Sequence, residues 1–236
     1  MLRPVRRLGR PQIQAPKHSA ATTVGMNTRV ITVASQAGSN GEQIASLVAQ
    51  EFGFGCLDHE VVERAARAAD VPSEIIRDAE RSRPLPERAL AAFANTGGWN
   101  AAAWYLGPAP AINPAYSPEG YRRTIDEVLR NLAREGHVVV MGHAGQMSLR
   151  DRWDTLRVLT VASERVRILR ILDALSVTEA EAREIVHRFD AERKAYFQQT
   201  YREHWLSPKL YDLCLNTDHL KPTEAAHLIC EAARQR

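Results

Sequence analysis

One stretch decides the fold of this chain: residues 30–45, which read VITVASQAGSNGEQIA. The β-branched residues at its start predict a strand, the small residues after them a turn, and residues 41 to about 51 an amphipathic helix. A glycine turn between a strand and a helix commonly holds phosphate. The reason is that amide N–H groups point outward at the helix start, where the helix dipole places about half a positive charge. The alternative is an ordinary strand–helix turn.

The turn has the small residues of a nucleotide site but lacks the lysine that usually neutralises the phosphate charge. Its candidate nucleotide-binding residues are Gly38, Ser39, Asn40, Gly41, Glu42 and Gln43. The glycines and the serine are small enough to let a phosphate approach the backbone, and Asn40 tolerates a left-handed conformation. The Walker pattern requires lysine and then serine or threonine after its last glycine. Here Glu42 and Gln43 stand in those places.

Length and composition bound the fold and the compartment. A chain of 236 residues with 44% hydrophobic residues suits one large α/β domain or a domain with a small lid. The three cysteines, Cys56, Cys214 and Cys230, form no CxxC pair, so we expect buried thiols, no zinc site and no disulfide framework. This pattern fits a reducing cytoplasm. No apolar run approaches the roughly 20 residues that a membrane helix needs.

The positive charge of the chain lies in its first 27 residues. They hold five of the 31 basic residues and no acid, so the rest of the chain carries 28 acidic against 26 basic side chains. Such a balance argues against a nucleic-acid-binding face. We expect residues 1–27 to be a disordered tail. Their composition resembles a transit peptide, but we favour translation that begins at Met26.

The rest of the chain alternates strands with helices and forms one domain, residues 28–236. Strands are expected at residues 29–34, 54–58, 138–141, 156–161 and 211–216, and helices at 41–52, 59–69, 121–135 and 222–234, with others opening at Pro72, Ser163 and Thr178. Residues 82–120 are rich in proline and aromatic residues, and we expect an irregular insertion there, on the side of the domain that would bind an acceptor substrate. The alternation predicts a parallel sheet with crossover helices.

Four blocks of the chain resemble the cytidylate kinase-like family, a branch of the P-loop nucleoside monophosphate kinases. The blocks are residues 31–45, 57–62, 132–144 and 190–217, and their order and spacing carry the resemblance. That branch tends to lack the Walker lysine. The resemblance implies an α/β fold: a three-layer P-loop kinase-like parallel sheet with flanking helices and a helical lid at residues 178–205. It also implies phosphoryl transfer from ATP with Mg²⁺ to a nucleoside monophosphate.

The resemblance assigns roles to several charged residues. Catalytic candidates from the lid are Arg193, which matches the family's Asp-x-x-Arg motif, together with Asp190 and Arg188. The alternative for Arg193 is a helix-surface pair, Asp190–Arg193 or Asp190–Lys194, worth about 0.2–0.5 kcal/mol. Two further arginines, at positions 167 and 170, also match family positions, and a solvated helix face is the alternative for both.

The acceptor-binding candidates are Asp58, His59 and His143. Family arginines near the phosphates are replaced at four positions: Ser35, Glu42, His59 and His143. Arginine is always charged and binds phosphate with two hydrogen bonds, whereas histidine is mostly neutral at pH 7. The two histidines could together hold a metal ion, but lone loop histidines seldom do, and we expect no metal site. The family's cytidine-reading groups are not visible at residues 141–144, so CMP as acceptor does not follow.

Three functions remain open on the sequence. The first is ATP-dependent phosphoryl transfer to a small acceptor. The second is a catalytically degenerate nucleotide-binding or sensory protein on the same fold. The third is a scaffold without a ligand that binds a partner through residues 95–118. We expect a small nucleotide as the partner molecule, and neither nucleic acid nor a membrane.

Overall fold

The computed structural model describes residues 27–58, 61, 63–64 and 118–236. The predicted tail, the helices predicted between residues 65 and 81, the insertion up to residue 117 and the candidate His59 lie outside the described residues. Of the family's four blocks, only residues 59, 60 and 62 of the second lie outside them. The sheet and the loop that opens the first helix can therefore be described.

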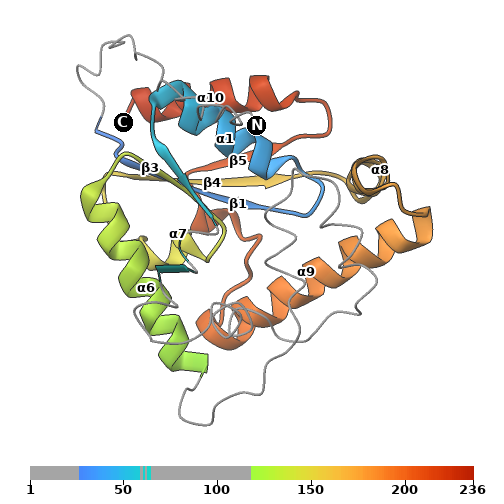
Figure 1. The fold of residues 1–236 in the computed structure, drawn as a ribbon, viewed down its shortest axis with the longest axis horizontal. Coiled ribbons are helices and arrows are strands. Elements are labelled where there is room, and N and C mark those ends of the chain that lie inside the picture. The colour runs from blue at the N-terminus through green and yellow to red at the C-terminus, as the bar shows by residue number, and fades with distance from the viewer. Residues whose placement is uncertain (1–26, 59–60, 62, 65–117) are drawn as a thin grey trace, which may run out of the picture.

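Five parallel strands form one sheet in the order β2-β3-β1-β4-β5. They are β1 Val30–Ser35, β2 Gly55–Leu57, β3 Val138–Met141, β4 Thr155–Val161 and β5 Leu213–Asn216. Val30 pairs with Val138 on one side and Thr155 on the other. The central strands are apolar and β-branched, as in a sheet covered on both faces. All five carboxyl ends meet at one edge, toward which the β4 arrow points in Figure 1.

Two helices cover one face of this sheet. They are α1, Gly41–Phe52, and α10, Pro222–Arg234, and they lie together above the strands in Figure 1. The core beneath them is apolar, and its buried members include Ile31, Val33, Ile44, Val48, Val139, Val158 and Ile229. Both helices match the predicted ranges, because their apolar residues recur at helical spacing.

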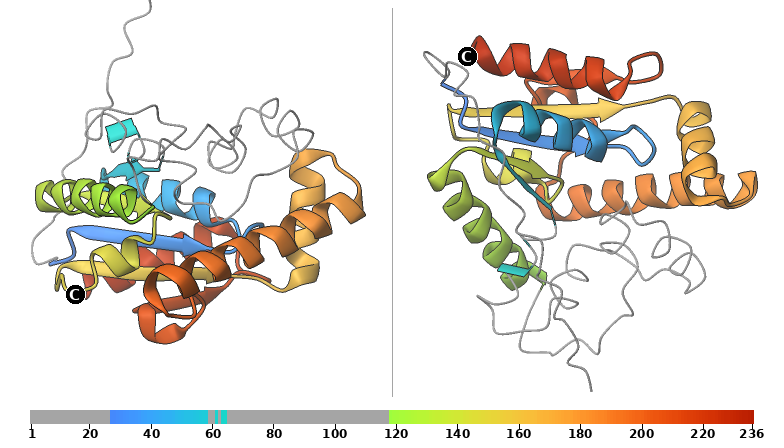
Figure 2. Two further views of the ribbon diagram at one scale, coloured as in Figure 1. Left: turned by 90° about the horizontal axis from the view of Figure 1, so that it is seen from below. Right: turned by 45° about the horizontal axis from the view of Figure 1, so that its top comes forward.

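The opposite face is covered by α6, Pro118–Glu135, the short α7, Gly145–Ser148, and part of α9, Glu179–Tyr201. Helix α8, Glu164–Leu175, stands at the carboxyl edge, and α9 runs from it back under the sheet toward α6 (Figures 1 and 2). The predicted three-layer parallel fold with flanking helices is confirmed.

Local signals in the sequence account for the ends of several elements. Thr178 accepts a hydrogen bond from the Glu181 amide in a capping box at the start of α9, and Gly136 follows α6 with a φ of 71°. Two predictions of detail were wrong. The last strand begins at Leu213 and not at Tyr211, because a 3₁₀ turn at Pro208–Leu210 comes directly before it. Of the three thiols only that of residue 230 is buried.

No helix in the described ranges is long and apolar enough to cross a membrane.

Candidate functional site

The loop between β1 and α1 has the backbone geometry of an anion site. It leaves the carboxyl edge of the sheet at Ser35 and enters α1 at Gly41. Gly38 has a φ of 80° and Asn40 a φ of 61°, so both are left-handed. The prediction that Asn40 tolerates this conformation is confirmed. Alternation of left- and right-handed residues turns successive amides toward one side, which makes a concave nest for anions.

The loop is held from behind through its carbonyl oxygens. Arg170 of α8 donates from Nη1 to Gly38 O at 3.2 Å and to Thr217 Oγ1 at 3.0 Å. Thr217 Oγ1 in turn donates to Ser39 O at 3.1 Å. Arg170 therefore does not belong to a solvated helix face: it ties the loop to the end of β5.

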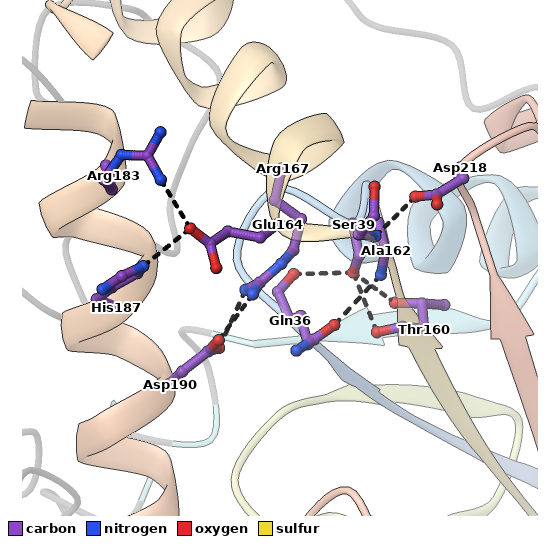
Figure 3. A network of polar contacts seen from close by, with 11 residues as sticks. Gln36, Ser39, Thr160, Ala162, Glu164, Arg167, Arg183, His187, Asp190 and Asp218 are labelled. Carbon is purple, nitrogen blue, oxygen red and sulfur yellow. Dashed lines mark hydrogen bonds and ion pairs between the residues drawn. The ribbon is translucent and has the colours of Figure 1, made fainter. Parts of the chain in front are cut away.

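Ser39 and Gln36 fasten the loop to β4 (Figure 3). Ser39 is fully buried, and its Oγ donates to Gln36 O at 2.8 Å and lies 2.9 Å from Thr160 Oγ1. The Gln36 side chain accepts from the Ala162 amide at 3.2 Å. These bonds satisfy buried carbonyl and amide groups with side chains and fix the back of the loop against β4.

The front of the loop carries amide groups that are left open. Within the part of the chain that the structure describes, no acceptor is bonded to the amides of Gly38, Asn40, Gly41, Glu42 and Gln43. The last three belong to the first turn of α1, where the helix dipole favours negative charge. The loop therefore presents preoriented donors to an anion of the size of a phosphate.

The two loop glycines pack closely against the protein interior. A Cβ at Gly41 would lie 2.2 Å from Ser35 Cβ and 3.1 Å from Thr160 Oγ1. A Cβ at Gly38 would lie 2.7 Å from the carbonyl oxygen of Arg167. Both positions face the protein interior, so close packing excludes a side chain there, and at Gly38 the left-handed backbone disfavours one as well.

Asp190 is bonded to Arg167 rather than to a neighbour on its own helix. Arg167 donates from Nη1 and Nη2 to the two carboxylate oxygens at 3.1 and 2.7 Å, and only 5% of Arg167 is exposed (Figure 3). The alternatives of a surface pair for Asp190 and of a solvated position for Arg167 were therefore wrong. A bidentate pair of this kind fixes both groups in orientation, and here it joins α8 to α9.

Arg193 lies beside the start of the loop. Its Nη1 donates to Ser35 O at 3.1 Å, and its guanidinium lies 5.1 Å from the centre of the Trp205 ring. Trp205 is 2% exposed, and Tyr211 Oη donates to its carbonyl oxygen at 2.6 Å. The aromatic platform was not predicted as part of the site, although its residues stand in the fourth family block.

Arg188, a second lid arginine, is half-buried and has buried donor atoms without a matching acceptor. Its Nε and Nη2 have no hydrogen-bond partner among the described residues. Burial lowers its pKa, while Glu192 and Glu184 act in the opposite direction. A buried donor without an acceptor costs free energy, and an anion could supply the missing acceptor.

The structure brings together two of the three predicted acceptor-side residues. His143 Nε2 lies 3.1 Å from Asp58 O and 3.6 Å from Asp58 Oδ1, and the His143 side chain is 1% exposed. His143 has a φ of 52° in the turn after β3. No three His, Cys, Asp or Glu side chains in the described ranges are placed to hold a metal ion.

Arg122 of α6 holds the turn after β3 through hydrogen bonds. The sequence did not predict this role. Arg122 donates from Nη1 to His143 O and to Tyr196 Oη, both at 3.0 Å, and it also bonds Asp126 and Ser148. A lone arginine in a helix pattern gives no signal of such a role. Only the fold brings α6, the turn after β3 and α9 to one side chain.

Glu42 does not carry the charge that its residue type suggests. Its side chain is partly buried, and burial followed by the charge of Asp58 raises its pKa to about 8. Glu42 and Asp58 therefore lie near each other between α1 and the end of β2. At pH 7 Glu42 is mostly neutral and repels a phosphate far less than a carboxylate would.

The parallel sheet and the anion loop at its carboxyl edge define a nucleotide-kinase-like fold. The chain belongs to the cytidylate kinase-like family, whose model matches residues 30–219. No curated protein is similar enough to this chain to count as a match.

Solved structures resemble the chain at low sequence identity. An uncharacterized protein from Eubacterium ventriosum is 14% identical with a TM-score of 0.63, over 89% of this chain and 100% of that chain. A shikimate kinase from Bacteroides thetaiotaomicron is 10% identical with a TM-score of 0.44, over 87% and 96% of the two chains. A shikimate kinase from Acinetobacter baumannii in complex with shikimate is 12% identical with a TM-score of 0.45, over 87% and 92%. At these identities the likeness concerns the fold.

Proposed function

We propose that the protein transfers a phosphoryl group from ATP to a small acceptor. The observation that carries this proposal is the loop of residues 36–43, whose carbonyl oxygens are held from behind while its amides are open in front. Such a loop binds phosphate without having to reorganise, and preorganised donors are what phosphoryl transfer requires.

The charged groups around the loop suit the remaining requirements of the reaction. Arg193 stands at the loop entrance and Arg188 has open donors, so both could neutralise charge on the moving phosphate. Mg²⁺ bound together with the nucleotide would neutralise part of the phosphate charge. The acceptor would lie toward Asp58 and His143 at the ends of β2 and β3. The family suggests a nucleoside monophosphate as the acceptor.

The experiment has a binding part and a turnover part. Melting temperatures are measured with ATP, GTP, CMP, UMP and dCMP, each with and without Mg²⁺, because a ligand of the native state raises its stability. ADP release is then measured with each candidate acceptor. We expect ATP to raise the melting temperature and one class of acceptor to stimulate ADP release. No shift with any nucleotide would contradict the proposal.

A matched pair of lid variants tests the role of Arg193. We expect Arg193→Met to lower turnover by about 10²–10³-fold, the loss typical of one donor to transition-state charge. Arg183→Met is the control: Arg183 lies on the same helix, is exposed and bonds Glu164 at 2.9 Å, away from the loop. Equal losses in both variants would exclude a specific role for Arg193.

A nucleotide-binding protein without turnover is the second candidate function. The observation that favours it is the set of non-basic residues at family arginine positions, among them Ser35, Glu42 and His143. ATP binding without ADP release for any acceptor would support this function over the transferase.

A further inference from the structure

The end of β5 contacts the loop between β1 and α1 through one buried side chain. Thr217 is fully buried, and its Oγ1 donates to Ser39 O at 3.1 Å and lies 3.2 Å from Val161 O. Val161 O already accepts from the Thr217 amide at 2.8 Å. Within the described ranges no other donor reaches Ser39 O. The single hydroxyl proton of Thr217 therefore satisfies this buried carbonyl group.

Arg170 of α8 fixes the orientation of that hydroxyl group. Its Nη1 donates to Thr217 Oγ1 at 3.0 Å, and its Nη2 donates to Thr217 O at 2.5 Å. Because a guanidinium can only donate, the hydroxyl oxygen accepts from Arg170 and its proton points away from it. Arg170 Nη1 also donates to Gly38 O at 3.2 Å. Arg170 and Thr217 together thus hold the carbonyl groups of two successive loop residues.

The peptide bond carries this contact to the front of the loop. Ser39 O and the Asn40 N–H belong to one planar trans peptide group, in which the C=O and the N–H point in opposite directions. The bond that holds Ser39 O from behind therefore turns the Asn40 N–H forward, where it has no acceptor in the described structure. Asn40 has a φ of 61°, a conformation that a residue other than glycine keeps only when its surroundings fix it.

We propose that Thr217 is a positioning residue for nucleotide binding: its hydroxyl group, oriented by Arg170, keeps the Asn40 N–H directed at a phosphate group of the nucleotide. The inference rests on the proposed nucleotide site. Thr217 acts through the loop and does not touch the phosphate, because its side chain is buried behind the loop. Without the hydroxyl group Ser39 O loses its donor, and rotation of the peptide group toward another donor would carry the N–H away from the phosphate.

The test is nucleotide affinity in a matched series of full-length variants. Thr217→Val keeps the shape of the side chain and removes the hydroxyl group. We expect its Kd for ADP and ATP to rise about 10- to 100-fold, the loss typical of one hydrogen bond to a charged group. Thr217→Ser keeps the hydroxyl group and should stay within a few fold of the parent. Inorganic tripolyphosphate, measured by displacement of ATP, should lose affinity by the same factor as ATP, because the effect lies at the phosphate groups.

Two further variants separate this role from a general loss of packing. Thr155→Val makes the same substitution at a buried position whose hydroxyl group has no partner in the described structure. Thr155 begins β4, at the edge of the sheet opposite the loop, so nucleotide affinity should keep its parent value. The double variant Arg170→Met/Thr217→Val should lose less affinity than the product of the two single losses, because both side chains act on the same stretch of loop.

A spectroscopic measurement on the unmodified protein does not depend on how a variant folds. ADP should shift the amide proton of Asn40 in a ¹H–¹⁵N spectrum of the parent, because this N–H gains a charged acceptor. The shift should be lost in Thr217→Val and return in Thr217→Ser.

Three results would overturn the inference. One is an Asn40 amide signal that ADP leaves unchanged in the parent, because this N–H would then not bind the phosphate. Another is a folded Thr217→Val variant with the parent's affinity for ADP. In both cases the nucleotide site itself stands. The third is a parent protein that binds neither ADP nor ATP, which would overturn the proposed function as well.

Discussion

The two faces of the sheet differ in chemistry. The face under α1 and α10 is an unbroken apolar core. The face under α7 and α9 mixes apolar side chains with buried polar ones, among them Arg122, Gln146, Ser148 and Tyr211, and it borders Arg193. Hydrogen bonds between elements place several of these groups, as in the bond of Gln146 Nε2 to Tyr211 Oη at 3.0 Å.

The difference indicates how stability and function are divided in this molecule. Apolar burial is favourable and needs no partner of fixed geometry. A buried polar group costs free energy unless its hydrogen bonds are made, so it gains little stability but fixes a side chain in one position. The apolar face thus supplies most of the stabilising burial, and the polar face positions groups near the loop.

The largest effect on stability is expected on the apolar face. Ile229 is fully buried in α10 against the sheet. Ile229→Ala should lower the free energy of unfolding by about 2–5 kcal/mol, and Ile229→Val by about 0.5–1.5 kcal/mol. Chemical denaturation checks both values. Because Ile229 lies in the core, ATP affinity in folded protein should not change, and an altered affinity would break the proposed division between the faces.

A smaller loss is expected where the loop meets the sheet. Gly41→Ala should cost about 1–3 kcal/mol through overpacking, because the new Cβ would lie 2.2 Å from Ser35 Cβ. Ser35→Gly removes the side-chain atoms nearest to it, so the double variant should recover part of the lost stability. A double-mutant cycle from melting curves measures this coupling. Additive losses would show that the Ser35 side chain is not the obstacle.

The smallest effect has the opposite sign and concerns the lid. Arg188→Met removes donors that have no partner in the described structure, so the empty protein should gain about 1 kcal/mol. The melting-temperature shift caused by ATP should decrease, because an anion loses a buried donor. Arg183→Met serves again as control and should leave the ATP shift unchanged. A lower melting temperature for Arg188→Met would mean that its guanidinium already has a partner in the empty protein.

Local patterns in the sequence predicted the order and type of the elements. Apolar runs placed the strands 138–141 and 156–161 to within one residue of β3 and β4. Helical spacing placed α1 and α10, and the family blocks gave the lid helix its position after Thr178. These features depend on neighbours within about ten residues, which a single sequence displays.

The partners of the charged side chains could not be predicted in the same way. Arg167 and Asp190 are 23 residues apart, and Arg170 and Thr217 are 47 apart. The spacing of such residues along the chain does not show which polar side chain each arginine will bond. The choice depends on how α8 crosses α9 and where β5 ends.

By itself the sequence determined that residues 30–45 form a strand, a turn and a helix, that the sheet is parallel and that a loop with phosphate-site character lies at its edge. Residue type and local spacing suffice for these, because they set backbone propensity and hydrophobic period. Only the tertiary structure decided that Gly41 faces Ser35 and that Glu42 stands beside Asp58 with a raised pKa. Those properties depend on burial and on charges brought from distant strands, and both arise when the chain is packed.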